Sequence, residues 1–540
     1  MKKMIVLSLC LALLVPFCAC GENRPSNADK DFSYVLSAEP RTLDPQVASD
    51  PSSLIVITSL FEGLVRLDEN GEPYPGVAES WSASNNSTVF TFSLREDACW
   101  SDISSDEPAV PVTAEDFVFA FRRAVNPDTH SPNASQFFCI KNAQRIYSGA
   151  MPAEALGVSA SGPYSLTVEL EYSLPDFPSL TASAAFMPCN EAFFLSTNGR
   201  YGLERKYVLG NGPFEFAGYY AWEHNSYLSL TRSSVYRGDT EALPANLYFY
   251  AGDSEVDLTD PLGALRTGTV QLLSVSASDA AAAEEEGMTV ARMNAATYGL
   301  CFNTSDELMK HTAIRKAFIQ TLSRDALLSK LPEGMTAADD IISPEMLLSG
   351  TCYRDAAGSG LLLPEDSGAA TAAASVLRSL DYETMPSVSV LCEDEPEIKL
   401  LINEMIVAWN NSMGNYFNMT PVDADELASR VSSGDYQIAF YALEPNGSTP
   451  MSLLEQFASS NEGGNPAHLK DASYDAAVAS FYTDSDLLSA CRTAETYLNT
   501  EGIFYPVCYG NAFYAAAPGV SGVVIYPYQS GIDFIHAGMD

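Results

Sequence analysis

The segment Phe90-Thr-Phe-Ser-Leu-Arg-Glu-Asp-Ala-Cys-Trp-Ser-Asp102, followed by Val112-Thr-Ala-Glu-Asp-Phe117, is typical of a strand that leads into a helix. Phe90, Phe92 and Leu94 alternate with polar residues, and this period of two predicts a strand with one buried face. The same chain segment therefore requires a core on one side of a sheet and a helix to cover it.

The helix that follows this strand is predicted from Thr113 to Val125. Thr113 is a candidate N-cap, and Asp116 stands at the third helical position, as in a variant of the capping box. Phe117, Phe121 and Val125 recur every four residues, so they share one face that we expect to be buried.

Similar patterns extend along the rest of the chain. Further strands are predicted at 166–170, 388–391, 437–441 and 522–526. Further helices are predicted at 312–330, 369–380, 398–409 and 485–500, and 277–287 is expected to be a solvated helix followed by a loop. Strands and helices are mixed without a regular alternation, so the expected class is α/β with mixed sheets.

Length and charge restrict the function further. The chain has 540 residues, with 29 Lys and Arg against 69 Asp and Glu, which gives a formal charge of 29 − 69 = −40. A chain of this length is expected to fold into two to four domains, at about 100–200 residues each. A charge of −40 argues against a nucleic-acid partner, because phosphate backbones are bound by Lys and Arg.

The N-terminus has the pattern of an export signal. Two lysines precede the apolar stretch Met4–Phe17, which is too short to span a bilayer of about 30 Å as a helix. The stretch ends at Cys18-Ala-Cys20 and resembles a bacterial lipobox, which implies cleavage before Cys20 and lipidation of this residue. We expect a signal peptide at 1–19 and a lipidated tether at 20–31. An ordinary signal peptide that contains cysteines is the alternative.

The sequence lacks the common motifs of catalysis and metal binding. No two of the five His lie within five residues of each other, and no GxSxG or GxxxxGK[ST] segment occurs. The eight Cys beyond Cys20 form no CxxC pair, and we expect them to be mostly reduced and structural. Gly210-Asn-Gly-Pro213 is interpreted as a turn and not as a cofactor cradle. We predict no enzyme, no cofactor and no metal site.

Several segments, taken in order, resemble one known family. These segments are Glu39-Pro-Arg-Thr-Leu-Asp-Pro45, Leu60-Phe-Glu-Gly-Leu64, Pro75-Gly-Val-Ala-Glu-Ser-Trp81, Gly210-Asn-Gly-Pro-Phe214 and Ile314-Arg-Lys-Ala-Phe318. They resemble the peptide- and oligopeptide-binding proteins of bacterial ABC transporters (solute-binding protein family 5), of the lipoprotein type. The resemblance covers 32–540.

The resemblance implies a two-lobed periplasmic-binding-protein-like fold (type II, cluster C-like) with mixed sheets and an extra subdomain on the large lobe. The expected divisions are 32–75 (lobe I), 76–207 (extra subdomain), 208–296 (lobe I), 297–506 (lobe II) and 507–540 (lobe I). The lobes are expected to close around a peptide held as an extended strand and to deliver it to a membrane permease and its ATPase. The expected location is the extracytoplasmic face of the cell membrane, as a lipid-anchored monomer.

The segment from Tyr436 to Pro450 resembles the family's cleft strand and the loop after it. The family commonly has Trp where this chain has Leu443, and Asp where it has Asn446; that Asp normally meets the ligand's ammonium group. Asn446 supplies no charge, so Glu444 is a candidate substitute, unless its side chain faces solvent. Ala442 and Leu443 are expected to offer backbone groups to the ligand.

Other candidate ligand-binding residues follow from the same resemblance. Ser49 and Asp50 occupy positions like those of a second ligand-pairing strand, and Tyr509 is expected to cap the cavity. Trp81 and Trp100 are expected in the core, and Arg95 in a surface ion pair. The open alternatives are a non-peptide solute (a nickel chelate, haem or an oligosaccharide), a cell-surface hydrolase, and a sensory or adhesive role.

Overall fold

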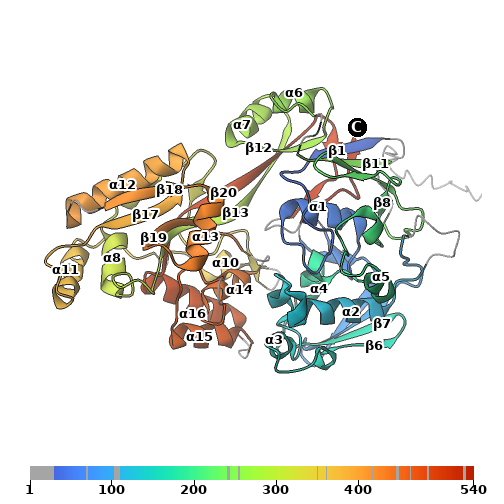
Figure 1. Cartoon of the computed structure of the whole chain (residues 1–540), viewed down its shortest axis with the longest axis horizontal. Coiled ribbons are helices and arrows are strands. Elements are labelled where there is room, and N and C mark those ends of the chain that lie inside the picture. The colour runs from blue at the N-terminus through green and yellow to red at the C-terminus, as the bar shows by residue number, and fades with distance from the viewer. Residues whose placement is uncertain are drawn as a thin grey trace, which may run out of the picture.

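The computed structural model describes residues 30–539, except for 69–70, 102–109, 240–243, 253, 255, 349–350, 361, 415–416, 446–448, 462–463, 483–485 and 527–530. Figure 1 shows two bodies that are joined by long strands. We call them the N-terminal body, which holds α1–α5 and β1–β11, and the C-terminal body, which holds α8–α16 and β17–β19.

One twelve-stranded sheet runs through both bodies. Its order is β18 (Phe417–Val422), β17 (Val388–Glu393), β19 (Ile438–Leu443), β13 (Thr289–Phe302), β20 (Phe504–Ala516), β12 (Leu272–Val275), β1 (Asp31–Val35), β11 (Asn246–Tyr250), β10 (Tyr227–Arg232) and β8 (Phe214–Phe216). Two short strands, β14 (Thr336–Ala337) and β9 (Trp222–Glu223), pair with β20 and β10.

The antiparallel pair β13 and β20 forms the connection between the bodies (Figure 1). Its register shifts twice, between Asn294 and Ala296 and between Tyr298 and Gly299. Gly299 lies opposite Pro506, which has no N–H to donate, and a Cβ at Gly299 would stand 2.3 Å from the carbonyl oxygen of Tyr505. Both irregularities are β-bulges within the crossing strands.

The N-terminal body contains a second, four-stranded sheet. Its order is β4 (Ala78–Ser84), β5 (Val89–Leu94), β7 (Ser165–Glu169) and β6 (Val158–Gly162). The helices of this body are α1 (Pro51–Leu60), α2 (Ala114–Val125), α3 (Ala143–Tyr147), α4 (Phe177–Leu180) and α5 (Glu191–Ser196). Helices α6 (Pro261–Arg266) and α7 (Ala277–Glu285) pack beside β12, next to the crossing strands (Figure 1).

The predicted strand and helix at the start of the chain are confirmed. Phe90, Phe92 and Leu94 are buried in β5, and Asp116 accepts hydrogen bonds from the N and the Oγ1 of Thr113 at 2.7 and 3.0 Å. Caps of this kind stabilise a helix by about 1 kcal/mol. Figure 1 places α2 against the four-stranded sheet, and its apolar face is part of the core.

A single hydrophobic core joins both sheets of the N-terminal body. It includes Phe32 of β1, Val56 of α1, Phe92 of β5 and Phe121 of α2. The four-stranded sheet is therefore packed onto the rest of this body without a core of its own. The proposed division between 75 and 76 lies within this shared core.

The C-terminal body surrounds the other end of the crossing strands with helices. These are α8 (Thr312–Gln320), α9 (Arg324–Leu328), α10 (Tyr353–Ala357), α11 (Ala369–Ser379), α12 (Pro396–Met413), α13 (Ala424–Ser433), α14 (Pro450–Leu454), α15 (Ala472–Ala479) and α16 (Leu487–Thr500). The single helix expected over 312–330 is wrong, because it ends at Gln320 and a new helix begins at Arg324. Within the described residues, no helix combines the length and the apolarity needed to cross a bilayer.

Candidate functional site

A cavity of about 710 Å³ lies between the two bodies, and we call it the central cavity. The N-terminal body supplies most of its wall, including Ser49, Phe61, Trp81, Tyr172 and Asp176. The C-terminal body supplies the remainder: Glu345, Leu347, Leu348, Pro445, Thr449, Met451, Ser452 and Glu455. A volume of this size is typical of a site that encloses a small organic ligand.

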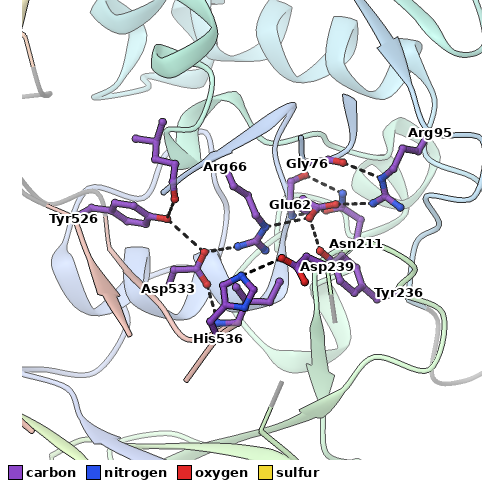
Figure 2. Close-up of polar contacts among 12 residues, drawn as sticks. Glu62, Arg66, Gly76, Arg95, Asn211, Tyr236, Asp239, Tyr526, Asp533 and His536 are labelled. Carbon is purple, nitrogen blue, oxygen red and sulfur yellow. Dashed lines mark hydrogen bonds and ion pairs between the residues drawn. The ribbon is translucent and has the colours of Figure 1, made fainter. Parts of the chain in front are cut away.

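Two short hairpins form one side of this cavity. The first pairs β2 (Val65–Leu67) with β3 (Pro73–Pro75), and the second pairs β22 (Val524–Ile525) with β23 (Ile532–Asp533). The hairpins belong to opposite ends of the chain, and Arg66 connects them (Figure 2).

Arg66 lies between two buried carboxylates. Its Nε donates to the Oε1 of Glu62 at 3.1 Å, and its Nη1 donates to the Oδ2 of Asp533 at 2.5 Å. The hydroxyl of Tyr526 donates to the carbonyl oxygen of Leu67 at 2.9 Å and lies 3.4 Å from the same Asp533 oxygen. Arg66, Glu62 and Asp533 are each less than one-tenth exposed.

Glu62 is held from several other directions (Figure 2). Its Oε2 accepts a hydrogen bond from the Nη2 of Arg95 at 2.8 Å, and the hydroxyl of Tyr236 donates to its Oε1. The expectation of a surface ion pair for Arg95 is therefore only partly correct. One partner, Asp97, is exposed, but Glu62 is buried. Buried carboxyl groups in proteins are usually paired and hydrogen-bonded, as Glu62 is here.

The segment Gly210-Asn-Gly212 positions Glu62. Asn211 accepts a hydrogen bond from the Glu62 N–H at 3.1 Å and donates to its carbonyl oxygen at 2.9 Å. A Cβ at Gly210 would lie 2.2 Å from the carbonyl oxygen of Leu60, so this close approach requires glycine. The segment is irregular with a bend at Gly212 and Pro213, and it fixes one wall of the central cavity.

The remaining wall of the cavity is largely apolar. Trp81 is half-buried, packs against the core and also lines the cavity, so the expectation for it is partly correct, whereas Trp100 is fully buried as expected. Tyr172 and Leu174 of the N-terminal body lie on the same cavity as Met451 of the C-terminal body. Such a wall can cover aliphatic and aromatic parts of a ligand.

Carboxylates dominate the charged groups of the cavity wall. Seven lining residues carry a carboxyl group: Glu62, Asp68, Glu72, Asp176, Glu345, Glu455 and Asp533. Among the described lining residues, the single basic side chain is Arg66. Burial raises the pKa of Glu345, although a hydrogen bond from the Asn294 N–H at 2.7 Å opposes this shift.

Ser49 and Asp50 precede helix α1. Ser49 lines the central cavity. Asp50 is the N-cap of α1, and its two carboxylate oxygens accept from the N–H and the hydroxyl of Ser53 at 2.9 and 2.7 Å. The side chain of Asn133 donates to the carbonyl oxygen of Ala48 at 2.8 Å, which fixes the loop that carries Ser49.

Ala442 and Leu443 end strand β19. Their partners on β13 are Tyr298 and Thr297. On the other side, β17 pairs only with Ile438 and Ala439, so among the described strands none pairs with that edge of β19 at 440–443. Leu443 is fully buried, and neither Ala442 nor Leu443 is among the described residues that line the central cavity.

Glu444 and Asn446 follow this strand. Glu444 is exposed, and its carbonyl oxygen accepts a hydrogen bond from the Nε2 of Gln456 at 2.7 Å. Pro445, the next residue, lines the central cavity. Asn446 lies outside the described residues.

Tyr509 lies in β20 and is buried. Its hydroxyl is 3.0 Å from the carbonyl oxygen of Asp340 and 3.3 Å from that of Ile342. Tyr509 is not among the described residues that line the central cavity.

Sequence reasoning missed the residues that organise the cavity, above all Arg66 and Asp533. Glu62 belongs to the segment Leu60–Leu64 and Arg66 lies four positions after Glu62, a spacing that can be detected in the sequence. Asp533 is 467 positions from Arg66, and no local pattern links them. The described residues contain no group of three or more His, Cys, Asp or Glu that could hold a metal ion.

The chain is similar to known binding proteins. The family model "Bacterial extracellular solute-binding proteins, family 5 Middle" matches residues 72–465. The dipeptide-binding protein DppE of Bacillus subtilis is 24% identical over 543 residues, with 97% of each chain covered. The probable deoxycholate-binding periplasmic protein YgiS of Escherichia coli is 26% identical over 528 residues, with 95% of this chain and 94% of that protein covered.

The fold is also similar to solved structures. Listeria monocytogenes OppA bound to peptide superimposes with a TM-score of 0.76 at 22% sequence identity, and the match covers 95% of this chain and 99% of that chain. This likeness confirms the predicted mixed α/β fold of periplasmic binding proteins with an additional sheet subdomain.

Proposed function

The chain belongs to family 5 of the bacterial extracellular solute-binding proteins, and from this premise we propose that it captures peptides in the central cavity and delivers them to an ABC importer. The observation that carries the proposal is the position of the cavity. Its wall is built from both bodies, which β13 and β20 connect. Movement of one body against the other would open and enclose such a site.

Peptides are favoured over other solutes by the open edge of β19. Backbone groups at 440–443 have no described strand beside them on one side, and the loop that follows enters the cavity wall at Pro445. An extended peptide pairs with an edge of this kind through its own amides, whatever its side chains. The names of DppE and of the peptide-bound OppA structure agree with this class of ligand.

The ligand contacts proposed for this function come from the cavity wall, from the end of β19 and from the residues that follow it. Ser49 lies on the cavity wall, and Ala442 and Leu443 lie on the open strand edge. Glu444 is the candidate partner of the peptide's ammonium group, because Asn446 is uncharged. Asp50 and Tyr509 act indirectly in this proposal, since both side chains are bonded within the protein.

The family is one of solute-binding proteins, so the chain is a binding protein and not an enzyme, and the hydrolase alternative is not retained. A non-peptide solute remains the second candidate. The similarity to the probable deoxycholate-binding protein YgiS and the apolar wall around Trp81 and Met451 favour it.

We also propose that the mature protein is a monomer anchored at the extracytoplasmic face by lipid on Cys20. The lipobox-like segment supports this proposal. Several acyl chains would hold the protein firmly at the membrane, beside the permease and ATPase that we propose as its partners.

Native mass spectrometry of the protein purified from its source cells tests the function. We expect adducts whose fragment spectra are those of peptides, lost after unfolding. Bile-acid-like or other non-peptide adducts would favour the second candidate. Addition of a peptide mixture to the ligand-free protein should restore peptide adducts of unchanged mass.

A further inference from the structure

We infer that the central cavity selects peptides with cationic side chains and disfavours peptide carboxylates. The inference rests on the proposed function and specifies the charge of the ligand. It follows from seven carboxyl groups and one guanidinium group on the cavity wall, and from the way this guanidinium is already occupied.

Arg66 does not provide a free positive charge for a ligand. Its guanidinium pairs with Glu62 and Asp533, and the second cation in contact with Glu62 is Arg95. Two guanidinium groups thus meet three carboxylates, those of Glu62, Asp533 and the exposed Asp97, so this cluster has no excess positive charge. A ligand carboxylate placed against the cluster would be repelled by the carboxylates of Glu62 and Asp533 as well as attracted by the guanidinium of Arg66.

One donor of this cluster remains available. The Nη2 of Arg66 is buried and has no hydrogen-bond partner among the described residues, and the whole side chain is only 7% exposed. A buried N–H without a partner is costly, so a ligand acceptor at this position would be stabilising. Because the charge of Arg66 is balanced, a neutral peptide carbonyl suits this donor better than a carboxylate.

The other five carboxyl groups give the cavity its net negative charge. Asp68, Glu72 and Asp176 belong to the N-terminal body, and Glu345 and Glu455 belong to the C-terminal body. Negative groups therefore stand on both sides of the cavity, and bringing the sides together is opposed by repulsion between like charges. Cationic groups of a ligand remove this repulsion, so they favour the enclosed state more than neutral groups do.

Glu455 of the C-terminal body shares the cavity wall with residues of the N-terminal body. Burial raises the pKa of Cys139 in the N-terminal body to about 12, and the charge of Glu455 adds a smaller contribution. Cys139 and Glu455 line the same cavity. A Lys or Arg side chain of a peptide bound in this cavity would be attracted by the carboxyl groups of both bodies, including those of Glu455 and Asp176.

A metal ion does not explain this charge. Within the described part of the chain, no three of these carboxylates come close enough together to hold one. The negative groups are distributed along the cavity, which matches an extended ligand with several separated positive groups.

Calorimetric titration of the ligand-free protein with three pentapeptides tests the inference. The peptides are Ala-Lys-Ala-Lys-Ala, Ala-Gln-Ala-Gln-Ala and Ala-Glu-Ala-Glu-Ala. We expect the lysine peptide to bind at least about tenfold more tightly than the glutamine peptide, and the glutamate peptide more weakly than both. The preference should shrink when salt rises from about 50 to about 500 mM, and C-terminal amidation should strengthen binding of each peptide.

Variants locate the effect in the cavity. Asp176→Asn/Glu455→Gln should reduce the preference for the lysine peptide over the glutamine peptide, expressed as the ratio of their affinities, by about tenfold. The matched control is Glu154→Gln/Glu285→Gln, which removes two exposed carboxylates outside the cavity and should change neither affinity.

The possible results separate the inference from the proposed function. Equal binding of the three peptides would overturn the charge preference and leave peptide capture standing. An effect of the control variant as large as that of Asp176→Asn/Glu455→Gln would also overturn it, because the total charge and not the cavity would then be responsible. Failure of all three peptides to bind would refute peptide capture itself, and the inference with it.

Discussion

The Nη1 of Arg66 donates to the Oδ2 of Asp533 at 2.5 Å, although 467 positions separate the two residues in the chain. This pair joins the hairpin of β2 and β3 to the hairpin of β22 and β23, and both hairpins line the central cavity. The start and the end of the folded chain are thus connected at the proposed ligand site.

Replacing Arg66 should strongly destabilise the protein. In Arg66→Met, Glu62 loses one partner and Asp533 loses its cation, and both carboxylates stay buried. We expect the free energy of unfolding to fall by about 3–5 kcal/mol, measured by urea denaturation. The control is Arg266→Met, because Arg266 also contacts two carboxylates, Asp260 and Glu286, but at the surface. The free energy of unfolding of this control variant should fall by about 1 kcal/mol or less. A similar decrease in the two variants would contradict the prediction.

Stability should decrease as pH rises from about 5 to about 8. Burial raises the pKa of six described carboxyl groups: Asp44, Asp116, Glu215, Glu345, Glu393 and Glu495. The folded protein therefore binds more protons than the unfolded chain above the ordinary carboxyl pKa, and this stabilisation is lost as pH rises through the raised values.

The other shifted groups change this expectation little. Carboxyl groups with a lowered pKa change their protonation below the ordinary carboxyl pKa, which is outside this pH range. The lowered pKa of His311 has the opposite effect on stability, but it is one group against six. Thermal unfolding at constant ionic strength measures the effect. Glu345→Gln should flatten the pH dependence, whereas Glu154→Gln should not. A melting temperature that rises between about pH 5 and pH 8 would contradict the prediction.

The buried cysteines should resist alkylation. Burial raises the pKa of Cys139, Cys301 and Cys508 each to about 12, so about one thiol in ten thousand is ionised at pH 8. Cys99 and Cys352 are half-buried. After brief treatment with iodoacetamide, peptide mass spectrometry should find label at Cys99 and Cys352 but little at the three buried residues.

Unfolding in urea provides the control for this labelling experiment. It should make all eight described cysteines equally reactive, since each is a free thiol. Rapid labelling of Cys301 in the native protein would contradict the structure. So would two cysteines that stay unlabelled in urea without reductant, because they would then form a disulfide.

Glu444 provides a test of ammonium recognition. If its carboxylate holds the peptide's amino terminus, Glu444→Gln should weaken binding of free-amine peptides much more than binding of N-acetylated ones, because charge-assisted hydrogen bonds are roughly twice as strong as neutral ones. Calorimetry with both peptide forms measures this difference, with Glu154→Gln as the control. Equal losses for both forms would remove Glu444 from the proposed site.

Ligand binding should compact the molecule. The cavity wall comes from both bodies, so enclosure of a peptide should decrease the radius of gyration measured by X-ray scattering. A saturating amount of the lysine pentapeptide is compared with a peptide that calorimetry shows not to bind. Superimposable curves in all cases would argue against closure.

Local patterns predicted local structure well. The alternation of Phe90, Phe92 and Leu94 and the cap formed by Thr113 and Asp116 are both present, because strands and helix ends are determined by residues close in sequence. The helix expected over 312–330 failed for a related reason. Its apolar spacing gave no sign of the interruption between Gln320 and Arg324.

The charged cluster of the cavity was beyond the reach of such patterns. Arg95 follows a strand and was expected at the surface, but its partner Glu62 comes from another segment and is buried. The resemblance identified the fold and the family, yet it did not indicate the excess of carboxylates on the cavity wall. Those groups come from segments between Glu62 and Asp533, and only the folded chain brings them together.

Two bulges in the pairing of β13 with β20, one with the extra residue Ala295 on β13 and one with the extra residue Val507 on β20, bear on the mechanics of the molecule. At Asn294–Ala296 and Tyr298–Gly299 the regular ladder with β20 is interrupted, whereas each body is stiffened by a continuous packed interior. A pair of strands that is held rigidly at both ends bends most easily where its hydrogen-bond ladder is interrupted. We therefore expect bending to concentrate within these few residues. The four-stranded sheet should then move as a rigid unit with the rest of the N-terminal body.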